Sequence, residues 1–117
     1  MGYESRVFVV NVTRGNRYNF AEKVAEVDMS CMRHDNGWRE LFTREIDYKL
    51  FMDDGNTEFD EDMYGEHLKA APVERVLEWL KQYMKTEKYR RLPLLYGLLK
   101  GIKENDWEEI EVVHYGH

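Results

Sequence analysis

A thiol and an imidazole lie three residues apart in the sequence, at Cys31 and His34. They have the chemistry of a nucleophile and its base, because an adjacent imidazole can take the proton of a thiol. Cys31, however, falls on the apolar face of an alternating segment, and apolar burial makes a thiol inert. The sequence therefore favours a structural cysteine over a catalytic one.

Two pairs of carboxylates share a spacing of two residues, Glu45 with Asp47 and Glu109 with Glu111. On a strand this spacing places both members of a pair on one face. General acid–base chemistry also needs a cleft that drives the two pKa values apart, and no sequence pattern indicates one. The simpler prediction is that both pairs lie on the solvated face of a sheet.

Other signatures of catalysis or metal binding are missing from the sequence. It contains no Gly-rich phosphate loop, no Gly-x-Ser-x-Gly and no His-Glu-x-x-His. One cysteine excludes an internal disulfide and a cysteine-rich zinc site. His114 and His117 supply only two ligands, and His114 shares the face of Ile110 and Val112, which predicts a histidine at the core edge. We therefore expect neither enzyme activity, nor a metal, nor a cofactor.

Residues 53–66 form an acidic segment with seven acidic side chains and no basic one. An EF-hand calcium loop does not fit its spacing. Starting at Asp54 puts Phe59 where the loop needs glycine, and starting at Asp60 puts Ala71 where it needs the final glutamate. A looser cation site, a solubilising loop and a surface for a protein partner remain as alternatives.

A solubilising loop is the simpler interpretation of this segment, and a partner surface is the leading functional hypothesis for it. Negative charge speeds the encounter with a basic partner, and aromatic anchors supply affinity. Trp79 adds an anchor if it is exposed, whereas it belongs to the core if its helix is buried over a wide face. The predicted partner-binding residues are Asp53, Asp54, Glu58, Phe59, Asp60, Glu61, Asp62, Tyr64 and Trp79.

The formal net charge of −6 conceals a strong segregation of charge along the chain. Residues 1–52 are balanced, residues 53–66 sum to −7, residues 67–103 to +6 and residues 104–117 to −5. An acidic total disfavours general binding to nucleic acid or to anionic membranes.

The basic block offers an alternative function, because it interleaves cations that neutralise phosphates with rings that stack on bases. Ordinary helix chemistry explains the same cations without a ligand, since cations stabilise the C-terminal end of a helix. The residues of this nucleic-acid alternative are Lys81, Tyr83, Lys85, Lys88, Tyr89, Arg90 and Arg91.

These side chains must be positioned by a single domain over residues 1–117, a typical domain length. A hydrophobic content of 43% excludes global disorder. β-Branched residues predict a strand over 5–14, and alternation predicts strands over 20–32 and 43–52. Joined by turns, the three strands form an antiparallel meander with one solvated face.

Further elements complete the predicted domain. A short fourth strand is expected over 67–71, and a final strand over 108–115 returns to the sheet beside the first. Between them, Pro72 opens one amphipathic helix and Pro93 opens a second, which ends at Asn105. The order βββ(β)ααβ predicts an α+β fold, an antiparallel sheet of four to five strands with two helices packed on one face.

The beginning of the sequence carries no targeting signal. It lacks the basic stretch and apolar core of a secretory signal, and its apolar run over 7–10 is too short to cross a bilayer. With a lone thiol, these features predict a cytoplasmic protein without membrane contact.

In small size, aromatic content, segregated charge and lack of catalytic motifs, the chain resembles small accessory proteins of phages and other mobile elements. The resemblance implies a non-enzymatic domain that binds and inhibits a host protein that handles nucleic acid. The leading hypothesis is therefore a protein-interaction domain whose acidic surface engages a basic partner. A homodimer, with the acidic segment of one chain against the basic helix end of another, remains open.

Overall fold

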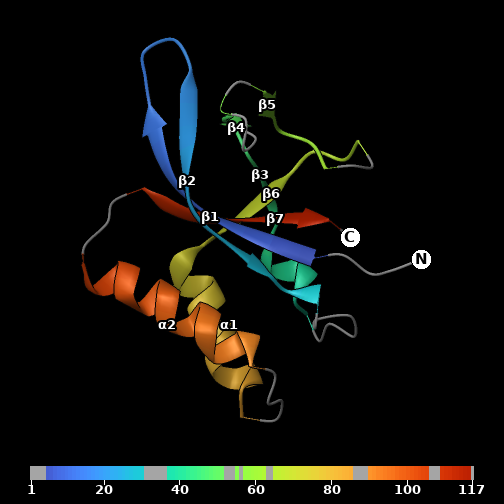
Figure 1. Cartoon of the computed structure of the whole chain (residues 1–117), viewed down its shortest axis with the longest axis vertical. Helices are drawn as coiled ribbons and strands as arrows, with labels where there is room; N and C mark the ends of the chain where they lie inside the picture. The colour runs from blue at the N-terminus through green and yellow to red at the C-terminus, as the bar shows by residue number, and fades with distance from the viewer. Residues whose placement is uncertain are drawn as a thin grey trace.

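The structure, a computed structural model, describes residues 5–30, 37–51, 55, 57–62, 65–85, 90–105 and 109–116. These residues form a five-stranded antiparallel sheet, a separate two-stranded ribbon and two α-helices (Figure 1). Both helices pack on one face of the sheet. The predicted α+β class and the two helices on one face are therefore confirmed.

The five strands of the main sheet do not follow the order of the chain. Across the sheet they are β2 (Asn19–Asp28), β1 (Ser5–Arg14), β7 (Ile110–Gly116), β6 (Lys69–Pro72) and β3 (Arg44–Glu45). Each neighbouring pair is antiparallel. The final strand thus lies beside the first, as predicted, and occupies the centre of the sheet.

One face of the sheet is covered by α1 (Val73–Tyr83) and α2 (Arg91–Glu104). Pro72 caps α1, and α2 begins two residues before Pro93, close to the predicted starts. A short 3₁₀ turn, η2 (Arg39–Leu41), adds the fully buried Trp38 to this side. The core of this face includes Val7, Val9, Trp38, Phe42, Val76, Leu80, Leu95, Leu99 and Val112.

The opposite face of the sheet is covered as well, which corrects the prediction of one solvated face. β4 (Leu50–Phe51) and β5 (Glu58–Phe59) form the β4–β5 ribbon, which lies over this side. The physical reason is that β1 is apolar on both sides, so its second face also needs a cover. The core beneath the ribbon is Phe8, Val10, Val12, Ala21, Ile46, Tyr48, Leu50, Leu68, Ala70 and Val113.

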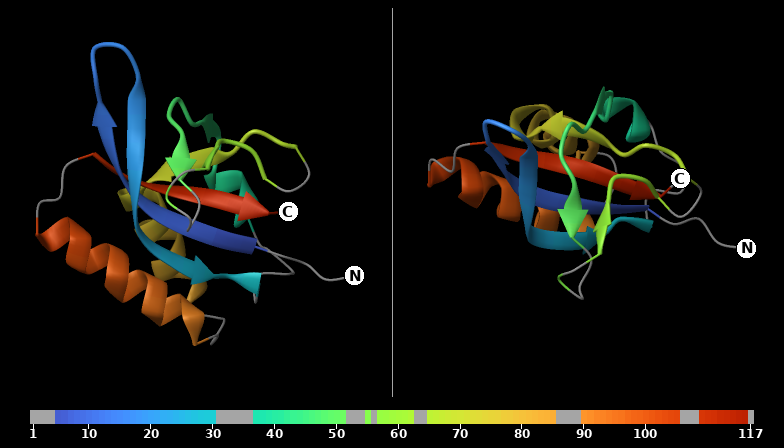
Figure 2. Two further views of the ribbon diagram at one scale, coloured as in Figure 1. Left: turned by 45° about the horizontal axis from the view of Figure 1, so that its top comes forward. Right: turned by 90° about the horizontal axis from the view of Figure 1, so that it is seen from above.

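The predicted single strand over 43–52 is wrong, because the segment pairs with two different neighbours. β3 pairs with β6 at one edge of the sheet, whereas β4 pairs with β5. Lys49 reaches the opposite edge, where its carbonyl accepts the N–H of Ala21. The segment therefore crosses the sheet, as the ribbon views of Figure 2 show, and its alternation reflects burial against the core rather than continuous strand pairing.

The predicted strand over 20–32 is partly confirmed, since β2 ends at Asp28. A bulge near Val24 interrupts its pairing with β1. On either side of the bulge, Ala21 faces the ribbon-side core and Val27 faces the helix-side core. Cys31 and His34 lie outside the described residues.

Candidate functional site

The β4–β5 ribbon sorts its four side chains between two faces. Leu50 pairs with Phe59, and Phe51 pairs with Glu58, and directly opposed residues of an antiparallel pair share a face. Leu50 is only 1% exposed, so its face of the ribbon is the buried one. Phe51 is 39% exposed, and Glu58 is exposed beside it on the outer face.

The predicted anchor Phe59 therefore points inward. Its ring lies 6.0 Å from the ring of Phe8 and 6.1 Å from that of Tyr115, centroid to centroid. The outward aromatic is Phe51, which was not among the predicted partner-binding residues. The sequence did carry the signal, because the alternation over 43–52 places Phe51 on the polar face, with Asp47 and Lys49.

The predicted acidic residues also divide into two groups. Glu58 and Glu61 are exposed, and neither forms an ion pair with a residue that the structure describes. Asp60, in contrast, lies 3.6 Å from the ammonium of Lys49, and Asp62 Oδ1 accepts the backbone N–H of Glu66 at 3.1 Å. Asp53, Asp54 and Tyr64 lie outside the described residues.

We call Phe51, Glu58 and Glu61 the acidic ribbon surface. Two further aromatic side chains extend it toward the tip of the β1–β2 hairpin. Phe20 bridges Lys49, two residues before Phe51, and is 40% exposed. Tyr18 is 71% exposed, and its ring lies 6.3 Å from that of Phe20. Exposed rings thus continue from the ribbon onto the neighbouring hairpin.

The acidic residues near the C-terminus are held very differently. The Glu111 carboxylate pairs with Arg44 and accepts the hydroxyl proton of Tyr48 at 2.7 Å, and its side chain is only 16% exposed. Burial also raises the pKa of Tyr48, which keeps that hydroxyl a proton donor. The predicted solvated face is therefore wrong for Glu111, because β7 became the central strand and both of its faces are covered.

Arg14 contacts one further carboxylate from each predicted pair, Asp47 and Glu109. Its guanidinium lies 2.7 Å from Asp47 and 3.6 Å from Glu109. The hydrogen bond to Asp47 raises the pKa of Arg14. Two arginines from the first half of the chain thus neutralise carboxylates of the C-terminal acidic block.

Trp79 and Tyr83 belong to the packing of the helix face. Their rings stack in parallel, 4.5 Å apart, and Trp79 also lies 5.4 Å from the buried Trp38. Trp79 is partly buried and packs against the helix-side core, and Tyr83 is only 9% exposed. The sheet separates both rings from the acidic ribbon surface.

The cations of the nucleic-acid alternative gather where α1 ends and α2 begins. Lys81, Lys85, Arg90 and Arg91 are all exposed and form no ion pair within the described part of the chain. The two lysines suit the negative end of the α1 dipole, whereas the two arginines lie at the positive end of α2. The helix dipole therefore accounts for the two lysines but not for the two arginines. Lys88 and Tyr89 lie outside the described residues.

Within the described ranges, no three His, Cys, Asp or Glu side chains lie close enough together to hold a metal ion. No helix there is long and apolar enough to cross a membrane. The sequence matches no protein-family model, and comparison with curated proteins and with solved structures found no similar chain.

Proposed function

We propose that this protein is a non-enzymatic interaction domain that captures a basic protein through its acidic ribbon surface. The observation that carries the proposal is the outward pair of Phe51 and Glu58 on the β4–β5 ribbon. An exposed aromatic ring beside carboxylates that form no ion pair with a described residue is poorly suited to a loop that serves only solubility, because such a loop gains nothing from an apolar side chain.

The two kinds of side chain have separate roles in this proposal. Glu58 and Glu61 attract a basic partner over a distance and speed its association. Phe51, with Phe20 and Tyr18 beside it, loses contact with water on binding and slows dissociation. The carboxylates take the place of phosphates in the groove of a protein that handles nucleic acid, so occupation of the groove inhibits that protein.

A partner of this kind is favoured over a closed homodimer. The acidic ribbon surface and the basic helix end lie on opposite faces of the sheet. A contact between them would join unlike surfaces of two copies, and such a heterologous contact leads to rings or open chains. A two-fold dimer instead needs a surface that complements itself.

The proposal is tested by affinity capture from a lysate of the native source, followed by quantitative mass spectrometry. The bait carries Glu58→Lys with Glu61→Lys, because neither carboxylate takes part in an ion pair of the described fold. Asp60 and Asp62 are left intact, since their contacts with Lys49 and with the backbone of Glu66 support the fold. A basic protein retained by the wild type and lost by this bait supports the proposal.

The matched control is Glu22→Lys with Glu78→Lys, which makes the same change in charge at exposed positions on β2 and α1. Capture of the same protein by this control shows that the loss depends on the acidic ribbon surface. If both baits lose the partner equally, net charge rather than this surface explains the capture, and the proposal fails.

A second candidate, binding to nucleic acid, is favoured by Arg90 and Arg91, which the dipole of α2 does not explain. It is weakened by Tyr83, whose ring stacks on Trp79 instead of facing solvent. A mobility shift with single-stranded and duplex DNA and RNA at low salt tests it, since phosphate contacts are strongest there. Binding that disappears in Arg90→Ala with Arg91→Ala would favour this candidate.

A further inference from the structure

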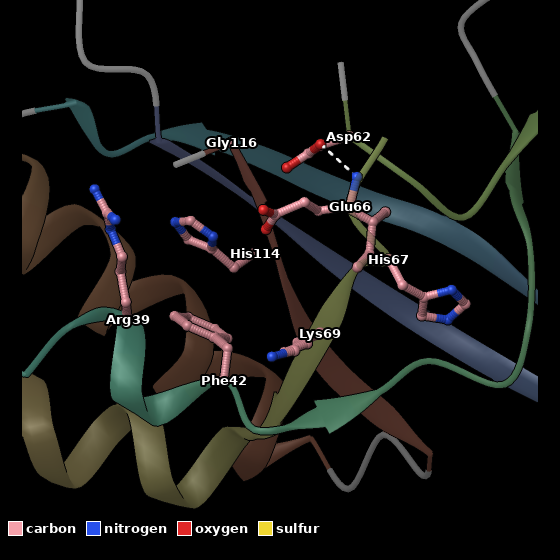
Figure 3. A pocket seen from close by; sticks show the side chains of 9 residues that line it. Arg39, Phe42, Asp62, Glu66, His67, Lys69, His114 and Gly116 are labelled. Carbon is pink, nitrogen blue, oxygen red and sulfur yellow. Dashed lines mark hydrogen bonds between the residues drawn. The ribbon is translucent and has the colours of Figure 1, made fainter. Parts of the chain in front are cut away.

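A small hollow opens beside the C-terminal end of β7, on the side of η2 (Figure 3). It has a volume of about 170 Å³, and its lining includes the apolar side chains of Phe42 and Leu68. Figure 3 shows the ring of His114 in its middle, between Arg39 and the Glu66 carboxylate. Asp62, His67 and Lys69 also line it.

The proton of His114 can be placed by following its hydrogen bonds. Ser5 is fully buried, and its Oγ accepts the Nε1–H of Trp38 at 3.1 Å. Within the described residues, the remaining partner of that hydroxyl is His114 Nε2, at 2.8 Å. We assign the hydroxyl as the donor to Nε2, because this gives the proton of the buried Ser5 an acceptor, and a neutral imidazole that accepts at Nε2 carries its proton on Nδ1.

The Nδ1–H of His114 has no acceptor among the described residues. Burial lowers the pKa of His114 to about 4, so the ring is neutral at physiological pH and keeps this arrangement. A ligand in the hollow can supply that acceptor.

The charges around the hollow have both signs. Lys69 and Arg39 contribute positive charge, and Glu66 and Asp62 contribute negative charge. Neither Lys69 nor Glu66 forms an ion pair with a described residue. His67 does not add to the set, because its ring bonds the carbonyl of Ile46 at 2.9 Å and points away from the hollow (Figure 3).

We propose that this hollow binds a small zwitterion, a ligand of the free amino acid class. Its carboxylate accepts the Nδ1–H of His114 and lies near Lys69 and Arg39, while its ammonium lies near Glu66 and Asp62. The hollow is a separate site from the acidic ribbon surface, and the proposal does not depend on capture of a protein partner.

The test is a titration of the ¹⁵N-labelled full chain, followed by NMR. The probes are L-alanine, which carries both charges, and acetate and ethylammonium, which each carry one. We expect L-alanine to shift the amide signals of Phe42, Lys69 and Gly116, and each single-charge probe to bind about tenfold more weakly, because it loses a charge-assisted contact. No shift with L-alanine, or equal affinity for acetate, would overturn the proposal.

His114→Gln is the decisive variant, because a glutamine amide can still bond Ser5 but offers no donor at the Nδ1 position. We expect it to bind L-alanine about tenfold more weakly, while Lys81→Ala, on α1, binds like the wild type. If His114→Gln does not fold, the variant Lys69→Ala replaces it, because Lys69 is exposed on β6. We expect the same tenfold loss of affinity for L-alanine. Unchanged affinity in the variant that folds would contradict the proposed site.

Discussion

The two acidic regions of the chain have similar charge in the sequence and different fates in the fold. Near the C-terminus, Glu111 is bound by Arg44 and Tyr48, and Glu109 lies beside Arg14. On the acidic ribbon surface, Glu58 and Glu61 remain exposed without an ion pair among the residues described. A run of acidic residues in the sequence therefore predicts the charge of a segment. Whether a basic side chain neutralises that charge depends on the fold.

The position of each region in the fold explains the difference. β7 is the central strand, so a carboxylate on it loses water and needs a partner to compensate. The β4–β5 ribbon is the outer layer, where a carboxylate stays hydrated at little cost. We expect substitutions in the first region to lower stability and substitutions in the second to alter binding.

The largest predicted effect is a loss of stability on acidification, because protonation of the partly buried His114 on β7 favours the unfolded state. The pKa of His114 is about 4 in the fold and about 6.5 when unfolded, so the unfolded state binds more protons between these values. The contribution of His114 to the free energy of unfolding is therefore fully present above pH 6.5. It is lost as the pH falls toward 4, and the loss is about 3 kcal/mol.

Urea unfolding at several pH values measures this loss. Arg39 lowers the pKa of His114 and Asp62 raises it, so both charges are kept in every variant. His114→Gln is expected to remove most of the difference between pH 7 and pH 4. An equal pH dependence in wild type and variant would show that His114 is not the group responsible.

Glu111→Gln is expected to lower the free energy of unfolding by about 2 kcal/mol, because it removes the charge that Arg44 and Tyr48 share. Glu61→Gln, at an exposed position of the acidic ribbon surface, should change the free energy of unfolding by less than about 0.5 kcal/mol. Chemical denaturation of both variants makes the comparison. If Glu111→Gln and Glu61→Gln lowered the free energy of unfolding by similar amounts, the contacts of Glu111 with Arg44 and Tyr48 would not stabilise the fold as expected.

The two aromatic residues of the ribbon allow a finer comparison at nearly the same place. Phe59→Ala should cost about 1.5 kcal/mol of stability, because its half-buried ring packs against Phe8 and Tyr115. Phe51→Ala should cost less than about 0.5 kcal/mol, since its ring faces solvent. Thermal unfolding of both variants measures the two losses. A larger loss for Phe51→Ala than for Phe59→Ala would contradict the orientation of the ribbon, with Phe59 inside and Phe51 outside.

Much of the fold could be predicted where local pattern and final environment agree. β1 matches its predicted bounds because a run of β-branched residues suits a strand that is buried on both faces. The apolar stripe of α1 was predicted because helical spacing alone selects the face that packs on the sheet. These signals need no knowledge of distant partners.

The sequence failed where the outcome depended on which segments became neighbours. Alternation over 43–52 correctly buries Ile46, Tyr48 and Leu50, but it says nothing about whether the backbone pairs with β6, with β5 or with neither. For the same reason the sequence did not show that Phe59 points inward, toward Phe8 and Tyr115, while Phe51 is exposed. Strand pairing sets the ribbon's faces, and the acidic composition of the segment does not.

The most direct test of the account is the association rate of the captured basic protein with this domain, measured by stopped flow over a range of salt concentrations. Glu58→Lys with Glu61→Lys is expected to slow association about tenfold at low salt, whereas Phe51→Ala should mainly speed dissociation. Glu111→Gln, if folded, should associate like the wild type. Association that is independent of salt, or slowed as much by Glu111→Gln, would contradict the central claim.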